Sequence, residues 1–377
     1  MHFFHIKPND PKTILIALVL IGALIFALQI PKSAPTPNSS SEIVPIVKMP
    51  LSEKKEKYSI APELTGIAGY INTNEGFKLS DAAGKVILVD FWTFSCINCI
   101  RTQPYLNVWQ EKYADKGLVI VGVHTPEFDF EKEIENVQKA VVKEKIKYPV
   151  VLDNDFSTWR AYKNRYWPRK YLIDADGFIR YDKIGEGAYE ETEQMIQQLL
   201  KERDEKIKLE ETAAKSIAAQ DSSQDFSQIG TPEIYLGYEF ARAPLGNVEG
   251  FQPNQIILYA FSAEEIQPNI VYLEGEWKNN ADHVELVSTT GKVKLLYKAK
   301  ALNIVAGNAG ELKINLNGNP LQEIEKGEDV QFQNGAGIVI TADKKLYNMV
   351  NATGYAPRLI EMNVTGKGFQ LYTFTFG

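Results

Sequence analysis

Apolar and polar positions follow two different patterns along the 377 residues of this chain, and the change divides it into two parts. Between about residues 61 and 212, short apolar runs alternate with segments of helical period, which predicts an α/β domain with helices on both faces of a sheet. Between residues 230 and 377, short β-like runs are separated by Gly, Asn and Asp, which predicts an all-β sandwich. The polar stretch of residues 213–229 is predicted to link the two parts.

The elements predicted for the first part alternate along the chain. We predict strands at residues 86–92, 118–123, 149–152, 169–174 and 178–184. We predict helices from residue 96 to about residue 116, and at residues 131–145, 157–164 and 189–210. Pro104 should kink the first helix, and the last two strands should form a hairpin around Asp176-Gly177. In the second part we predict strands at residues 255–261, 269–277, 283–288, 293–299, 311–315, 337–341, 358–364 and 370–376.

The first sixty residues have a third pattern. Residues 13–30 are uncharged and apolar, and at about 1.5 Å per residue a helix of this length nearly spans the hydrocarbon core of a bilayer. Two lysines precede the segment and one follows it, so residues 1–12 are predicted to be a cytoplasmic tail and both domains to be extracytoplasmic. Residues 31–60, rich in Pro, Ser and Lys, are predicted to be a flexible linker.

A cleavable signal peptide is the main alternative to a single-pass membrane anchor. The apolar run is followed by no clean cleavage site of small residues, because Lys32 occupies the −3 position of the best candidate. We therefore predict an uncleaved anchor in the cell membrane.

Composition limits the classes of function that remain. With 44% hydrophobic and 11% aromatic residues, the chain can fill two cores of ordinary domain size. The formal charge of −7 and the absence of a basic stripe argue against a nucleic-acid partner. The chain has only two cysteines and no spare thiol, as is typical of an oxidising compartment.

Those two cysteines, Cys96 and Cys99, follow directly after an apolar strand and open a helix. At this spacing two sulfurs can close a disulfide with little backbone movement, while the positive end of the helix stabilises a thiolate. We predict that Cys96 is the attacking thiol, with a low pKa, and that Cys99 is the shielded resolving thiol. Asp90, the only charged residue in the preceding strand, could accept and return the proton of the resolving thiol.

Other interpretations of these residues exist. A zinc site would need four ligands, and none of the histidines has paired ligand spacing, so no metal and no separate cofactor is expected. A structural disulfide across two residues would close too short a loop to stabilise the fold much. Asp90 could simply be a strand-end carboxylate that accepts backbone hydrogen bonds, and Trp92 could be part of the core.

Three motifs, VDFWTFSCINC, GVHTPEF and YWPRKYLIDADG, resemble the membrane-anchored thioredoxins of the TlpA and ResA type, and most closely the extracytoplasmic part of DipZ-type proteins. The resemblance implies a thioredoxin-like fold for residues 61–212. It also implies that Pro168 is cis and lies against the dithiol, where the backbone edge can pair with an extended substrate. We expect Trp92 and Trp167 to contact that substrate. His124, a single histidine at a strand end, is left out of the chemistry.

The resemblance extends to the ends of the second domain, at residues 231–237 and 372–377, and implies a jelly-roll domain that is similar to carbohydrate-binding modules. A glycan is therefore an expected ligand of that domain. DipZ-type proteins also carry a multi-helix membrane domain that imports electrons, whereas a single apolar segment occurs here. We therefore expect a separate membrane protein of the CcdA type to supply the electrons, unless the protein is an oxidant.

Three hypotheses follow. The favoured one is an anchored thiol–disulfide oxidoreductase that acts on secreted protein disulfides or on apocytochrome thiols. The second is a thiol peroxidase of the redoxin superfamily; it needs Pro and Thr at the −7 and −3 positions from the attacking cysteine, and Thr93 fits this pattern whereas Val89 does not. The third is a surface-binding protein that acts through its β-domain.

Overall fold

The computed structural model describes residues 49–214, 224–261 and 266–377. The predicted membrane anchor at residues 13–30, the predicted tail at residues 1–12 and most of the predicted linker lie outside the described residues. Within the described ranges, no helix is both long enough and apolar enough to cross a membrane.

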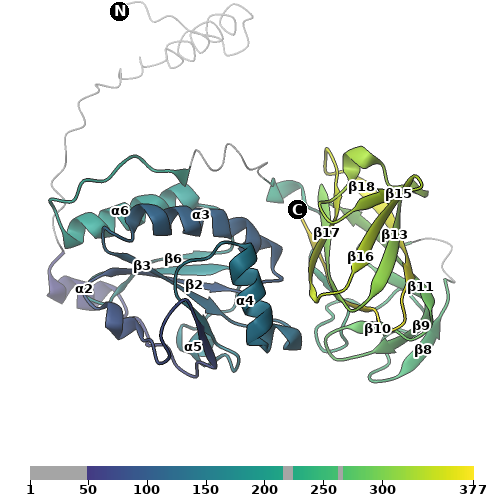
Figure 1. Cartoon of the computed structure of the whole chain (residues 1–377), viewed down its shortest axis with the longest axis horizontal. Coiled ribbons are helices and arrows are strands. Elements are labelled where there is room, and N and C mark those ends of the chain that lie inside the picture. The colour runs from purple at the N-terminus through teal and green to yellow at the C-terminus, as the bar shows by residue number, and fades with distance from the viewer. Residues whose placement is uncertain (1–48, 215–223, 262–265) are drawn as a thin grey trace, which may run out of the picture. The chain divides into compact units, whose positions relative to one another are not determined.

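The first domain contains one sheet of six strands in the order β1-β4-β3-β2-β5-β6 (Figure 1). Its strands are β1 (Gly69–Ile71), β2 (Val86–Trp92), β3 (Leu118–His124), β4 (Val150–Leu152), β5 (Arg169–Ile173) and β6 (Ile179–Ile184). The strands β2, β3 and β4 run parallel, and β1, β5 and β6 pair antiparallel with their neighbours. All seven residues of β2 are buried, as expected for a continuous apolar run at the centre of a sheet that is covered on both faces.

Helices cover both faces of this sheet. The helices are α2 (Leu51–Lys57), α3 (Ile97–Tyr113), α4 (Ile134–Lys143), α5 (Ser157–Ala161) and α6 (Tyr189–Arg203), with short 3₁₀ turns at Leu79–Ala82 and Asp129–Lys132. On one face, Val86 and Leu88 share a core with side chains of α3, α4 and α6, and Figure 1 shows α3 and α6 lying side by side over the sheet. On the other face, Val89 and Phe91 pack against Trp159 of α5.

The structure confirms the predicted alternation of strands and helices, with corrections at the element ends. The last helix ends at Arg203 rather than near residue 210, and α4 begins three residues later than predicted because residues 129–132 form a separate 3₁₀ turn. Pro104 lies inside α3, and the kink expected there stays a prediction.

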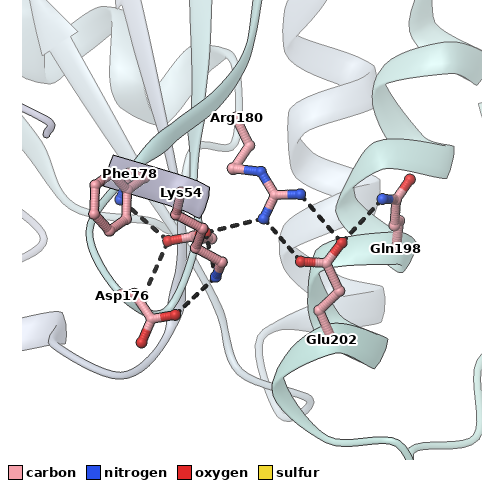
Figure 2. Close-up of polar contacts among 7 residues, drawn as sticks. Lys54, Asp176, Phe178, Arg180, Gln198 and Glu202 are labelled. Atoms are coloured by element: carbon pink, nitrogen blue, oxygen red, sulfur yellow. Dashed lines mark hydrogen bonds and ion pairs between the residues drawn. The ribbon is translucent and has the colours of Figure 1, made fainter. Parts of the chain in front are cut away.

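The flexible linker predicted for residues 31–60 includes residues that belong to the first domain. Residues 51–57 form α2, and Lys54 of this helix is 2% exposed. Its ammonium group lies 2.7 Å from carboxylate oxygens of both Asp174 and Asp176. Arg180 joins Asp174 to Glu202 of α6, so that one network connects α2, the β5–β6 hairpin and α6 (Figure 2). These buried ion pairs hold the segment in place, although its sequence has no apolar periodicity.

The second domain is rich in β-structure. Its strands are β7 (Ile234–Tyr235), β8 (Ile256–Tyr259), β9 (Val271–Asn279), β10 (Val284–Leu286), β11 (Thr290–Lys298), β12 (Ala301–Gly307), β13 (Gly310–Leu316), β14 (Asn319–Pro320), β15 (Gln331–Gln333), β16 (Ala336–Thr341), β17 (Lys345–Asn351), β18 (Pro357–Thr365) and β19 (Gln370–Phe376), with 3₁₀ turns at Phe226–Gln228 and Glu323–Glu325. The first half of β9 pairs with β11, and its second half pairs with β8 and β10.

One core joins the two halves of this β-domain. Leu302 of β12 and Phe374 of β19 share an apolar cluster with Leu295 of β11 and Ile360 of β18. All eight predicted strands overlap observed strands, whereas β7, β12, β14, β15 and β17 were not predicted. Every residue of β12 is buried, so the strand lacks the alternation of apolar and polar residues that identifies a half-exposed strand. The predicted jelly-roll order stays a prediction.

Candidate functional site

The two cysteines lie where β2 meets α3. Cys96 is the N-cap residue of α3, and its sulfur accepts a hydrogen bond from the backbone N–H of Cys99 at 3.3 Å. Both are free thiols in this structure. Cys96 is half-buried, whereas Cys99 is only 1% exposed. A substrate can therefore reach Cys96 but not Cys99, which matches the predicted attacking and resolving roles.

The prediction of a low pKa for Cys96 is wrong. Burial raises the pKa of Cys96, and the hydrogen bond from Cys99 offsets only part of this effect. Burial raises the pKa of Cys99 further, to well above the ordinary thiol value, and the interaction with Cys96 adds to the increase. The predicted order of the two thiols nevertheless holds, because Cys96 remains the more acidic. The sequence pattern reveals the helix start but not how much surrounding structure removes the sulfur from water.

Asp90 lies in the middle of the sheet. It is fully buried on β2, in register with Gly122 of β3 and Lys170 of β5. Burial raises the pKa of Asp90 to about 7, and the charge of Lys170 partly opposes this increase. Among the described residues, neither oxygen of Asp90 has a hydrogen-bond partner, so this carboxylate is not the backbone-bonded strand end that was the alternative interpretation.

Asp90 and the resolving thiol influence each other electrostatically. The charge of Asp90 is among the causes that raise the pKa of Cys99. A carboxyl group with a pKa near 7 can exchange a proton near neutral pH. The arrangement therefore fits the predicted transfer of a proton between Cys99 and Asp90.

Pro168 lies at the same end of the sheet as the dithiol. The Trp167–Pro168 peptide bond is cis, as the sequence resemblance implied. Phe91, near the end of β2, pairs with Arg169, the first residue of β5, so the chain leaves β2 for Cys96 beside the point where it enters β5 from Pro168. The half-buried Trp167 donates a hydrogen bond from Nε1 to the carbonyl oxygen of Thr125 at 3.0 Å.

The predicted substrate contact of Trp92 is wrong. Its side chain is 1% exposed and packs edge-on against His124, with the ring centres 5.1 Å apart. Trp92 is therefore part of the core, the alternative that the sequence left open. His124 is also fully buried, and burial lowers its pKa to about 3, so it is neutral at physiological pH. In the described ranges, no group of three or more His, Cys, Asp or Glu residues could hold a metal ion.

The sequence analysis missed Glu131. This fully buried residue accepts hydrogen bonds from the hydroxyl of Ser95 at 2.6 Å and from the backbone N–H groups of Glu127 and Phe128. It thereby fixes the residue before Cys96 to the loop that follows β3. The only sequence signal was the position of Glu131, three residues after the GVHTPEF motif. The sequence analysis placed the start of a helix at this residue and gave it no further role.

Comparisons with known proteins find family matches for both domains. Residues 59–200 match the Redoxin family, and residues 231–377 match the family described as "Thioredoxin like C-terminal domain". Protein DipZ of Mycobacterium bovis is 35% identical over 324 residues, which cover 85% of this chain and 43% of DipZ. The chain therefore spans less than half the length of that relative.

Two further matches each cover less than two fifths of this chain. The thiol-disulfide oxidoreductase ResA of Bacillus thuringiensis is 27% identical over 146 residues, which cover 39% of this chain and 82% of ResA. A crystal structure of a putative thiol:disulfide interchange protein DsbE from Chlorobium tepidum covers 38% of this chain and 96% of its own, with 27% identity and a TM-score of 0.34.

Proposed function

Because this chain is a thioredoxin-like protein of the TlpA, ResA and DipZ type, with its redoxin domain at residues 59–200, we propose that it is a thiol–disulfide oxidoreductase that acts on protein substrates. One observation carries the proposal. The half-buried thiol of Cys96 lies at the start of α3, next to the buried thiol of Cys99. Both lie at the end of the sheet that also holds the cis proline Pro168. An accessible thiol next to a shielded one is what a two-step disulfide exchange requires.

In the reducing direction, the Cys96 thiolate attacks one sulfur of a substrate disulfide. A Cys96–substrate disulfide forms, and the other substrate sulfur leaves as a thiolate and takes up a proton. Cys99 then gives its proton to Asp90 and attacks the sulfur of Cys96. The Cys96–Cys99 disulfide forms and the second substrate thiolate leaves, so the dithiol has lost two electrons and the substrate has gained two.

An extended segment of the substrate pairs with the backbone beside Pro168 in this proposal. The indole of Trp167 is fixed by its hydrogen bond to Thr125 and by packing against Trp159, with ring centres 4.3 Å apart. A backbone edge supplies affinity without requiring a particular sequence, which suits an enzyme that acts on many protein disulfides.

The cellular setting is also a proposal. The apolar segment of residues 13–30 supports a single-pass membrane anchor with the domains extracytoplasmic. The absence of a third cysteine supports an oxidising compartment. A membrane donor of the CcdA type would return two electrons to the dithiol, and substrates would be secreted proteins or apocytochromes c. The β-domain would bind a glycan in a jelly-roll fold.

Insulin reduction with dithiothreitol as the electron source tests the oxidoreductase. We expect the protein to accelerate the reaction and Cys96→Ser to abolish the acceleration. Cys99→Ser should instead accumulate a mixed disulfide with a substrate peptide, which mass spectrometry detects, because Cys96 can attack but nothing resolves the product. Full activity of Cys96→Ser would end the proposal.

A further inference from the structure

The redox site contains a buried lysine that the reaction described above does not use. Lys170 is the second residue after Pro168, on β5, and it is fully buried. Removing an ammonium group from water is energetically unfavourable unless nearby groups compensate its charge. The surroundings of Lys170 should therefore contain a compensating group.

The other buried cations of this domain have direct partners. Lys54 contacts Asp174 and Asp176, and Arg180 contacts Asp174 and Glu202, all at 2.7–3.0 Å (Figure 2).

Lys170 has no such contact. Its ammonium group donates one long hydrogen bond of 3.4 Å, to the carbonyl oxygen of Gly185, and lies 5.8 Å from the ring centre of Tyr189. No carboxylate of the described residues lies within ion-pair distance of it. Lys170 is therefore an exception in this domain.

The carboxylate that faces Lys170 is Asp90. The two residues are directly opposite on neighbouring antiparallel strands, so their side chains extend from the same face of the sheet. Both are fully buried, and Asp90 also lacks a hydrogen-bond partner among the described residues. For each of the two residues, the charge of the other is the largest effect that opposes burial. Lys170 lowers the pKa of Asp90, and Asp90 raises the pKa of Lys170.

We propose that Lys170 is a positioning residue for the resolving step, because its buried ammonium group keeps Asp90 ionised near neutral pH and so able to take the proton of Cys99. The proposal rests on the oxidoreductase function. It assigns Lys170 no contact with the substrate. Its effect passes through the charge of Asp90.

Other titratable groups surround the pair. They come from α3, the segment before β4, β6, the loop after β6, and α6, and are Cys99, Tyr148, Lys183, Glu186 and Tyr189. The tyrosines are neutral in the relevant range because burial raises their pKa values. The charges of Lys183 and Glu186 act on Lys170 in opposite directions. A shift of the pH profile after substitution of Lys170 would therefore report the Lys170–Asp90 interaction.

The test measures the resolving step alone. A peptide is first attached to Cys96 as a mixed disulfide, and its release by Cys99 is followed against pH. An opposite charge at close range typically lowers a carboxyl pKa by about one unit or more. Lys170→Met should therefore shift the midpoint of the profile upward by about one unit, with a several-fold slower release at pH 7 that recovers at higher pH. Lys170→Arg should follow the wild type.

Lys54→Met is the matched control. It also removes a buried lysine, but at the far end of β5, so it should lower stability without moving the profile. If Lys170→Met does not fold, Lys170→Gln keeps a hydrogen-bond donor for Gly185 without the charge and should show the same shift. A folded neutral variant with the wild-type profile would overturn the proposal. Failure of the wild-type protein to reduce insulin would instead overturn the oxidoreductase function.

Discussion

Replacing Asp90 by Asn should change how the stability of the first domain depends on pH. Asp90 is fully buried, its pKa in the folded protein is about 7, and its ordinary value is 3.8. Between these two values the folded state holds a proton that the unfolded state has released. The free energy of unfolding of the wild-type protein therefore falls as pH rises from about 4 to 7, and the loss is complete above pH 7.

The size of the effect follows from the difference between the two pKa values. A difference of about three units corresponds to about 4 kcal/mol in total, of which about 2 to 3 kcal/mol falls between pH 5 and pH 8. The amide in the Asp90→Asn variant does not titrate, so the stability of the variant relative to the wild type should rise by this amount over that range. Without Asp90, Lys170 should lose its proton more readily, and this loss also favours the folded variant as pH rises.

Urea unfolding of the reduced protein, followed by tryptophan fluorescence, measures the change. Four of the five tryptophans lie in the first domain, so the signal reports mainly on that domain. Asp115→Asn is the control, because the Asp115 side chain is 76% exposed and its loss should leave the pH dependence unchanged. If the wild-type and Asp90→Asn proteins lose stability in parallel from pH 5 to 8, then Asp90 does not titrate in this range and the proton-transfer role fails with it.

Two further predictions concern the surroundings of the dithiol. In the folded, reduced protein, iodoacetamide should modify Cys96 and spare Cys99, as measured by mass spectrometry. The rate of modification should still be rising at pH 9, because burial raises the pKa of Cys96. A rate that levels off below pH 8 would contradict this. Glu131→Ala should lower the free energy of unfolding by about 3 kcal/mol, because it leaves the hydrogen-bond donors of Ser95, Glu127 and Phe128 without an acceptor. It should also slow insulin reduction. A free energy of urea unfolding within about 1 kcal/mol of the wild type would show that the loop does not depend on this carboxylate.

The sequence predicted those features of the site that depend on neighbours in the chain. The apolar run before Cys96 and the spacing to Cys99 are local, and they were enough to place a strand, a helix start and two thiols with different exposure. Asp90 could also be identified, because it is a single charge in an apolar strand. The cis form of Pro168 followed mainly from a family resemblance.

Features that depend on pairing between distant segments could not be predicted. Lys170 appears in the sequence as an ordinary polar residue near a strand start, and only the register between β5 and β2 places it opposite Asp90. Glu131 and Ser95 are 36 positions apart in the chain and meet only through the packing of the loop after β3. Trp92 could equally have faced the substrate or the core, because its burial depends on α3 and β3 together.

Burial raises the pKa of both the proton donor, Cys99, and the proton acceptor, Asp90, with opposite effects on the proposed proton transfer. It raises the pKa of Cys99 to well above the ordinary value, so the resolving thiol almost never loses its proton spontaneously at neutral pH. The same burial raises the pKa of Asp90 to about 7, which makes it a far stronger base than an exposed aspartate. An acceptor with an ordinary pKa near 4 would hold the proton too weakly to take it from such a thiol, whereas an unopposed buried carboxyl would already be protonated. The acceptor must lie between these limits, and Lys170 is the group within the sheet whose charge opposes the effect of burial.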